Sequence, residues 1–368
     1  MSAALLFVAT RKGLFTIERT TSGWRVRDHH FAGEPVSQFV EDVRDGTWYA
    51  ALRLGHFGVK LHRSGDQGRT WTEVASPQFP AKPASGVWAA DPTPWNVDMV
   101  WALASAGGAS DAGHLWAGCA PAGLFRSTDG GRSWNLASTL WYDERRLEWM
   151  GGGYDHPGIH SICVDPRDAR CLSIAISCGG VWHSSDDGEH WQLRGEGLVA
   201  PYTPPEAARN PNIQDVHALS QCAADPAVFW IQHHEGCYRS ADAGRSFVRL
   251  TAPSPGDFGF PIVADPGNAL RAWVVPAAAD ARRYATDGAM HVARTDDAGA
   301  TWQAFREGLP QKHAYDLVYR RGLAVAPDRC TLAIGSTSGG VWLSPDAGEH
   351  WTALDARLPP VHQVRFAH

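Results

Sequence analysis

The sequence predicts an all-β fold, and within that class a seven-bladed β-propeller built from four-stranded antiparallel blades. The first observation is an eight-residue pattern that recurs six times, about 56 residues apart, as expected of a repeat architecture. The second is that short apolar segments of strand length lie on both sides of the copies. The third is the composition, because 38 glycines and 24 prolines among 368 residues indicate many turns. Since each repeat adds its own layer of core, such a fold holds a chain of this length in one domain.

Each copy of the pattern has the chemistry of a hairpin turn. An aspartate is followed two residues later by a glycine and five residues later by an aromatic residue. The aspartate can accept hydrogen bonds from nearby backbone N–H groups, the glycine can adopt a positive φ, and the aromatic ring begins the next strand. We therefore expect these aspartates to be structural. They are Asp66, Asp129, Asp186, Asp242, Asp297 and Asp346.

Four apolar segments per repeat predict the four strands, A to D, of one blade. Near the N-terminus, residues 5–10, 13–17 and 24–26 supply strands B, C and D of a seventh unit that lacks a strand A. At the other end of the chain, residues 361–366 form an unattached apolar segment. We expect this segment to become strand A of blade 1, because that pairing leaves no open edge. The alternative is six blades with a loose N-terminal hairpin.

These assignments predict one propeller domain over residues 1–368. The blades are expected at 5–27 with 361–367 (blade 1), 36–75 (blade 2), 98–137 (blade 3), 158–194 (blade 4), 214–250 (blade 5), 259–305 (blade 6) and 314–354 (blade 7).

The eight-residue pattern, as in Ser-Thr-Asp-Gly-Gly-Arg-Ser-Trp at 127–134, resembles the BNR or Asp-box repeat of the sialidase superfamily. That superfamily includes sialidases, xyloglucanase-type glycosidases, sortilin-like receptors and a photosystem II assembly factor. The whole chain is also similar to a group of bacterial proteins labelled glycosyl-hydrolase-like for their repeats. The resemblance implies a β-propeller but carries little about activity, because function lies in the site rather than in the fold.

Strand alternation assigns the connections to two faces of the predicted propeller. The A–B turns and the aspartate turns share one face, and the B–C loops and D–A crossovers share the other. Most long segments belong to the second face, which predicts that it is the functional one. These segments are 76–98, 138–158, 195–213, 276–290 and 306–314.

Three cations are candidate ligand-binding residues on that face. Arg11 and Lys12 end an apolar strand beside a glycine, so together they could hold a carboxylate or a phosphate. Arg365 lies on the predicted closing strand, which should bring it toward the axis.

Histidines recur on the predicted inner strands. His160 and His217 occupy matching places in blades 4 and 5, and His233 and His234 follow a strand of blade 5. With one of the latter pair, His160 and His217 could bind a divalent metal at the channel mouth. Purely structural histidines are the alternative, and no resident cofactor is predicted. We select His160 and His234 as ligand-binding residues.

Carboxylates in the D–A loops are candidate acids and bases. Glu148 precedes a run of three glycines, and Asp215 and Asp257 precede inner strands. Our candidate catalytic set is Glu148, Asp257 and His217, which could supply acid–base chemistry. A glycosidase needs two carboxyl groups roughly 5–10 Å apart, a distance that a sequence does not supply. Capping of the loops is the alternative role.

Two functional hypotheses follow. Sialidases carry an Arg-Ile-Pro segment near the start of the chain, and this chain contains none. Xyloglucanase-type enzymes resemble two seven-bladed rings that clamp a polymer, whereas one ring is predicted here. We therefore expect neither sialidase nor endo-xyloglucanase activity. The first hypothesis is a glycosyl-hydrolase-like or degenerate enzyme that acts on, or binds, a small sugar-like or anionic ligand. The alternative is a non-catalytic scaffold for protein assembly.

Composition excludes several other classes. The formal net charge is −6, which predicts no nucleic-acid partner. No apolar run reaches the roughly 18 residues of a membrane helix, and the N-terminal stretch lacks the basic start of a signal peptide. The seven cysteines include no Cys-x-x-Cys pair, which favours thiols in a reducing compartment. We therefore expect a cytoplasmic protein without membrane partners.

Overall fold

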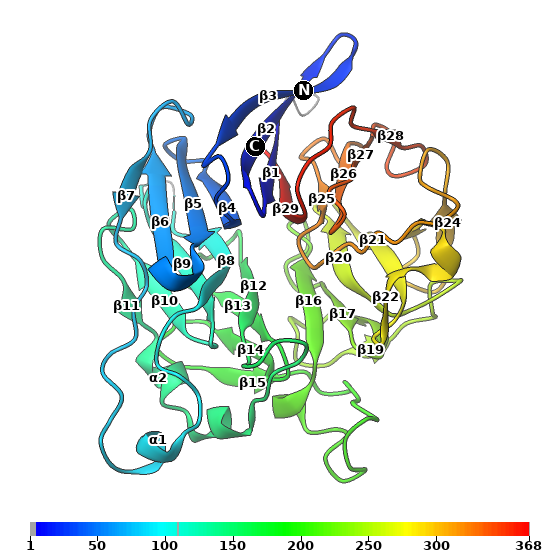
Figure 1. Ribbon diagram of the computed structural model, residues 1–368. Coiled ribbons are helices and arrows are strands. Elements are labelled where there is room, and N and C mark those ends of the chain that lie inside the picture. The colour runs from blue at the N-terminus through cyan, green and yellow to red at the C-terminus, as the bar shows by residue number, and fades with distance from the viewer. Residues whose placement is uncertain (1–4, 109, 368) are drawn as a thin grey trace. The chain divides into compact units, whose positions relative to one another are not determined.

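A computed structural model describes residues 5–108 and 110–367, and its regular secondary structure is mainly antiparallel sheet (Figure 1). The strands form seven sheets with the topology of seven four-stranded blades, and one sheet carries an additional fifth strand. The predicted seven-bladed β-propeller is therefore confirmed. In this part of the chain, no helix combines the length and the apolar character needed to cross a membrane.

The chain folds into two compact units. One contains Met1–Val36, Gly195–Arg209 and His217–His368, and the other contains Ser37–Arg194 and Asn210–Val216.

The first unit holds four sheets. The first sheet has the order β29 (Val361–Phe366), β1 (Leu5–Thr10), β2 (Gly13–Thr20) and β3 (Gly23–His30), and the second has the order β16 (Val216–Gln221), β17 (Phe229–His233), β18 (Gly236–Ser240) and β19 (Val248–Arg249). The third has the order β20 (Gly259–Asp265), β21 (Asn268–Ala279), β23 (Val292–Thr295) and β24 (Gln303–Phe305), and β22 (Arg282–Ala285) also pairs with β21. The fourth has the order β25 (Leu323–Val325), β26 (Leu332–Gly335), β27 (Val341–Ser344) and β28 (Thr352–Ala353). One short 3-10 helix, η4 (Thr286–Gly288), follows β22.

The second unit holds three sheets. One sheet has the order β4 (Val36–Asp42), β5 (Thr47–Arg53), β6 (Val59–Ser64) and β7 (Thr72–Val74). The next has the order β8 (Met99–Ser105), β9 (Leu115–Ala120), β10 (Leu124–Ser127) and β11 (Asn135–Leu136). The last has the order β12 (Ile159–Val164), β13 (Leu172–Ile176), β14 (Gly180–Ser184) and β15 (Gln192–Arg194). Short helical turns lie in its connections: η1 (Gly55–Phe57), α1 (Val87–Ala90), α2 (Ser138–Trp141), η2 (Glu144–Glu148) and η3 (Pro211–Ile213).

The C-terminal strand completes the first blade, as predicted. β29 pairs antiparallel with β1, with Leu6 opposite Phe366 and Val8 opposite Val364. Figure 1 shows the red β29 beside the blue β1. The pairing places a full four-stranded sheet at the start of the chain, so the alternative of six blades with a loose hairpin is wrong.

The core lies between neighbouring sheets, and tryptophans supply much of it. Trp230 of β17 packs with side chains of β20 and β21, whereas Trp273 of β21 packs against β25, β26 and β27. Trp182 of β14 and Trp116 of β9 belong to one cluster of the second unit. All four are at most 2% exposed. Because a buried indole removes a large apolar area from water, the abundance of tryptophan follows from the number of sheet-to-sheet interfaces.

The six aspartate turns share one hydrogen-bond pattern. In the third turn, Ser184 Oγ donates to Asp186 Oδ1 at 2.9 Å, and the backbone N–H of His190 donates to the same oxygen at 2.9 Å. Gly188, at φ 85°, donates its N–H to Ser184 Oγ. The equivalent aspartate bonds recur at Asp66, Asp129, Asp242, Asp297 and Asp346. Each carboxylate thus holds its own turn closed.

These bonds make the turns sensitive to acid. The backbone N–H and side chain of His190 lower the pKa of Asp186 to about 2, from 3.8. A lowered pKa means that the stabilisation is complete above pH 3.8 and is lost as the pH falls toward 2. We expect Asp186→Ala to lower the melting temperature by a few degrees at pH 7, and the deficit to shrink between pH 3.8 and pH 2.

Differential scanning calorimetry at several pH values measures this difference. Glu189→Ala, at an exposed position of the same turn, is the control and should melt like the wild type. An Asp186→Ala protein that loses ligand binding but melts like the wild type would show that Asp186 is functional rather than structural.

Candidate functional site

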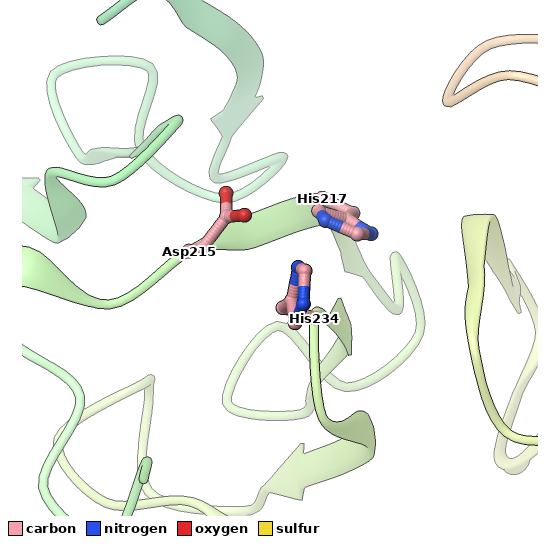
Figure 2. A group of neighbouring side chains, drawn as sticks. All are labelled: Asp215, His217 and His234. Atoms are coloured by element: carbon pink, nitrogen blue, oxygen red, sulfur yellow. The ribbon is translucent and has the colours of Figure 1, made fainter. Parts of the chain in front are cut away.

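Three side chains converge where β16 begins and β17 ends (Figure 2). Asp215 directly precedes β16, His217 is the second residue of that strand, and His234 directly follows β17. Since β16 and β17 are neighbours in one sheet, the start of one strand lies beside the end of the other. One carboxylate oxygen and one nitrogen from each imidazole all lie within 4.8 Å of one another. Asp215 and His217 are buried, and His234 is half-buried.

His217 is held in one tautomer and one orientation. Its Nδ1 lies 2.6 Å from the carbonyl oxygen of Gly259. A carbonyl oxygen only accepts hydrogen bonds, so Nδ1 carries the proton and the lone pair of the neutral ring is on Nε2. The ring is stacked on Phe260, with centroids 4.6 Å apart and planes 16° apart. Packing and hydrogen bonding therefore fix this imidazole before any ligand arrives.

The His234 ring contacts three other rings. Its ring contacts His217 edge-on at 5.4 Å, Phe258 edge-on at 5.6 Å and Tyr202 at 4.9 Å between centroids. Tyr202 is 48% exposed. The second histidine thus lies between buried residues and a solvent-exposed tyrosine.

An aromatic and cationic group continues from His217 over the next blades. Phe260 contacts Tyr319 edge-on at 5.1 Å. The guanidinium carbons of Arg283 and Arg320 lie 5.5 and 5.4 Å from the centroid of the same ring, within the range of a cation–π contact. We call Phe258, Phe260, Tyr319, Arg283 and Arg320 the aromatic wall. Phe260 is 3% exposed and Tyr319 is 36% exposed, so the buried ring supports polar and aromatic groups that face water.

The predicted catalytic carboxylates each have partners. Asp257, beside the aromatic wall, accepts from Arg249 at 3.2 Å, and a side chain on Gly236 would approach its carboxylate to 3.0 Å. Glu148 ends η2 in the second unit and accepts from the amides of Asn212 and Asn210, at 2.9 and 3.3 Å. The two carboxylates belong to different compact units. Their predicted roles in acid–base catalysis stay predictions.

The other predicted ligand-binding residues are distributed along the chain. Arg11 and Lys12 are exposed in the turn between β1 and β2, and Arg365 is half-buried on β29. His160, second in β12, is 1% exposed, and its two ring nitrogens lie 2.9 Å from Ser161 Oγ and 2.7 Å from the carbonyl oxygen of Val216. Of all the predicted catalytic and ligand-binding residues, His217 and His234 are the two that the structure brings together at this site.

The grouping of Asp215 with the two histidines was not predicted from the sequence. The signal was present as Asp-Val-His at 215–217, because residues i and i+2 of an extended segment share a face. The aromatic wall gave no comparable signal, since its members come from three separate segments of the sequence.

A second polar group lies in the other unit. Arg53, at the end of β5, donates to Asp98 at 2.6 Å and to the Tyr154 hydroxyl at 2.5 Å, and that hydroxyl also donates to Asp98. Burial and the hydrogen bond to Asp98 raise the pKa of Tyr154 to about 12. The phenol therefore stays protonated at neutral pH, which disfavours it as a nucleophile.

The comparisons with known proteins agree with the fold. No protein-family model matches the sequence, and no curated protein sequence matches it significantly. Among solved structures, the chain is similar to a GH74 enzyme from Niastella koreensis, with 13% identity, a TM-score of 0.55 and coverage of 97% of this chain and 65% of that one. An ancestral GH74 enzyme gives 16% identity, a TM-score of 0.58 and coverage of 90% and 38%. The chain thus spans less than two thirds of either enzyme.

A second group of similar structures has a different description. YCF48 from Cyanidioschyzon merolae gives 11% identity, a TM-score of 0.55 and coverage of 89% of this chain and 87% of that one. A structure described as YCF48 bound to D1 peptide gives 14% identity, a TM-score of 0.53 and coverage of 87% and 81%. At such identities the likeness establishes the β-propeller fold and leaves the function to the site.

Proposed function

We propose that this protein binds a small polyhydroxylated or anionic ligand at the aromatic wall beside His217 and His234. The observation that carries the proposal is the packing around Phe260, which brings one histidine, one tyrosine and two arginines together at a single ring. Aromatic faces stack on sugar rings. Guanidinium groups hold carboxylates and phosphates through paired hydrogen bonds.

The wall is built to present these groups rigidly. Phe258 and Phe260 are buried and contact one another edge-on at 5.5 Å. Arg283 is further oriented by Asp280, which accepts from it at 2.5 Å. A preorganised site loses less conformational entropy when a ligand binds.

Binding rather than hydrolysis is the proposed activity. A glycosidase requires two cooperating carboxyl groups with a defined separation. Of the two candidate carboxylates, Asp257 of the first unit is in an ion pair with Arg249. Glu148 of the second unit is held by two asparagine amides of that same unit. The geometry therefore favours recognition of a sugar-like molecule over cleavage of one.

The scaffold hypothesis is favoured by a different observation. Tyr202, Tyr315 and Tyr319 are 48%, 68% and 36% exposed, and exposed tyrosines are enriched where proteins bind one another. One of the structures of similar fold is described as bound to a peptide.

Calorimetric titration with glucuronate, glucose 6-phosphate and glucose tests the binding proposal. We expect the two anionic ligands to bind more tightly than glucose. The double substitution Arg283→Ala/Arg320→Ala should weaken anion binding by about 10- to 100-fold, the range expected for loss of one or two charged hydrogen bonds. Arg282→Ala is the matched control, because Arg282 is the exposed neighbour of Arg283 on β22, and it should bind like the wild type.

Two other outcomes would contradict the proposal. If the double variant binds the anions as tightly as the wild type, the ligand lies elsewhere. If no sugar binds but a protein partner co-purifies and is lost in Tyr202→Ser/Tyr315→Ser/Tyr319→Ser, the scaffold hypothesis is correct.

A further inference from the structure

We infer that Asp215, His217 and His234 form a binding site for a divalent transition-metal ion. Within residues 5–108 and 110–367, these residues are the one group of three His, Cys, Asp or Glu side chains whose ligand atoms all lie within 4.8 Å of one another. Figure 2 shows the three side chains near one another, at the start of β16 and just after the end of β17. This inference shares His217 and His234 with the surroundings of the proposed sugar site, but it rests on the spacing of three ligand atoms and is tested with the metal alone.

The donor set selects the class of metal. Two imidazoles and one carboxylate suit Zn²⁺, Fe²⁺, Co²⁺ or Ni²⁺, whereas Mg²⁺ and Ca²⁺ prefer sites made of oxygen ligands. Three protein ligands leave at least one coordination position for water or for another ligand. Because the His234 ring also contacts exposed Tyr202, this ligand lies close to solvent.

The separation of the three ligand atoms is compatible with binding. Ligand atoms bonded to one metal at about 2.0–2.2 Å lie roughly 3–3.5 Å apart. A group already within 4.8 Å therefore needs a contraction of about 1–2 Å at most. His217 is fixed by Gly259 and Phe260, whereas half-buried His234 starts the turn between β17 and β18, so the second imidazole is the one positioned to adjust.

The surroundings of two ligands are those of a metal site. A metal-binding histidine usually donates its second ring N–H to a carbonyl or a carboxylate, and His217 Nδ1 makes that bond to Gly259. Asp215 is approached by backbone at Gly152, where an added Cβ would lie 3.0 Å from Oδ1. Gly152 thus leaves room for the carboxylate while keeping it covered.

Metal content and cobalt spectroscopy test the site on the full-length protein. After treatment with EDTA and gel filtration, the wild type should take up one equivalent of Zn²⁺, and its melting temperature should rise on metal addition. Co²⁺ should give visible absorption bands of a cobalt ion bound by protein nitrogen. Asp215→Asn and His217→Gln, which nearly preserve side-chain volume, should each weaken Zn²⁺ binding by at least 100-fold. His234→Gln should weaken it as well.

His291→Gln is the matched control, because His291 directly precedes β23 and is as deeply buried as His217, at 1% exposure. It should retain wild-type metal binding. Equal Zn²⁺ affinity in Asp215→Asn, His217→Gln and wild type would overturn the inference and place the metal elsewhere, for example at the exposed His190–Asp186 or His350–Asp346 pairs. Absence of both uptake and cobalt bands in the wild type would also overturn it. Because the probe is the metal alone, a failure to bind Zn²⁺ would not change the meaning of the sugar titration. A failure to bind sugar would likewise not change the meaning of the metal experiment.

Discussion

Deletion of residues 360–368 should abolish stable folding at 37 °C. The deletion removes β29, whose Val361, Val364 and Phe366 are 2–4% exposed and pack with Leu6 and Val8. Burial of each such side chain contributes about 1.5–3 kcal/mol. The loss is therefore roughly 5–9 kcal/mol before hydrogen bonds are considered, which approaches the whole stability of a typical domain. It also leaves β1 as an open edge, which favours aggregation.

The yield of soluble protein and its thermal melting measure this effect, and two further experiments isolate its cause. Val364→Ala should lower the stability in a full-length chain that still folds, whereas Arg357→Ala, at an exposed position shortly before β29, should have little effect. A synthetic peptide of residues 358–368 should restore folding when added to the truncated chain. A truncated protein that melts like the wild type would refute the role of β29 in completing the first blade.

Arg146→Met should cost about 3–5 kcal/mol in the free energy of unfolding. Arg146 donates to Asp91 at 2.7 Å, and the two side chains are only 2% and 3% exposed. The guanidinium also lies 3.9 Å from the centroid of the Trp141 ring and 4.7 Å from that of Trp88. Removing one partner of a buried ion pair leaves the other charge without compensation, which accounts for the size of the expected effect.

The pH dependence of this variant has a defined sign. Burial raises the pKa of Asp91, but hydrogen bonds from Thr93 and Arg146 outweigh it and leave the pKa below 3.8. The stabilisation is thus complete above pH 3.8 and is lost as the pH falls below that value. Urea unfolding at pH 7 should show the full deficit of Arg146→Met, and unfolding at progressively lower pH below 3.8 should show a smaller one.

A double variant separates the ion pair from the packing around it. Asp91→Asn/Arg146→Met removes both charges while an asparagine can still accept from the N–H of Thr93, as Asp91 does at 3.0 Å. This protein should be more stable than Arg146→Met alone. If both unfold at the same urea concentration, the deficit of Arg146→Met comes from lost contacts with the tryptophans rather than from an unpaired charge. Because Arg146 lies in η2, the pair also anchors the segment that carries Glu148.

Local chemistry was sufficient to predict the blades. Asp186, Gly188 and the aromatic residue that follows them lie within six consecutive positions, and the hydrogen bonds that close this turn join residues at most four apart. Interactions of such short range are visible in a sequence pattern. The closing role of β29 was predictable for a related reason, since an unattached apolar segment and a blade lacking one strand fit only each other.

The candidate site was predictable only in part. His217 and His234 stand out as polar residues at the ends of apolar strands, and β16 and β17 are consecutive in the chain, so their meeting follows from the hairpin order. The aromatic wall is different, because Phe260, Arg283 and Tyr319 come from three separate segments. No periodicity within any one of these segments indicates the other two.

By itself, the sequence determined the fold class, the number of blades and the structural role expected of the six aspartates, because those properties arise from contacts between near neighbours repeated along the chain. Tertiary structure alone decided that Phe260 supports both His217 and two arginines, and that the Gly259 carbonyl sets the tautomer of His217. The physical reason is that side-chain orientation depends on packing between blades. That packing joins residues tens of positions apart, so the repeat pattern does not encode it.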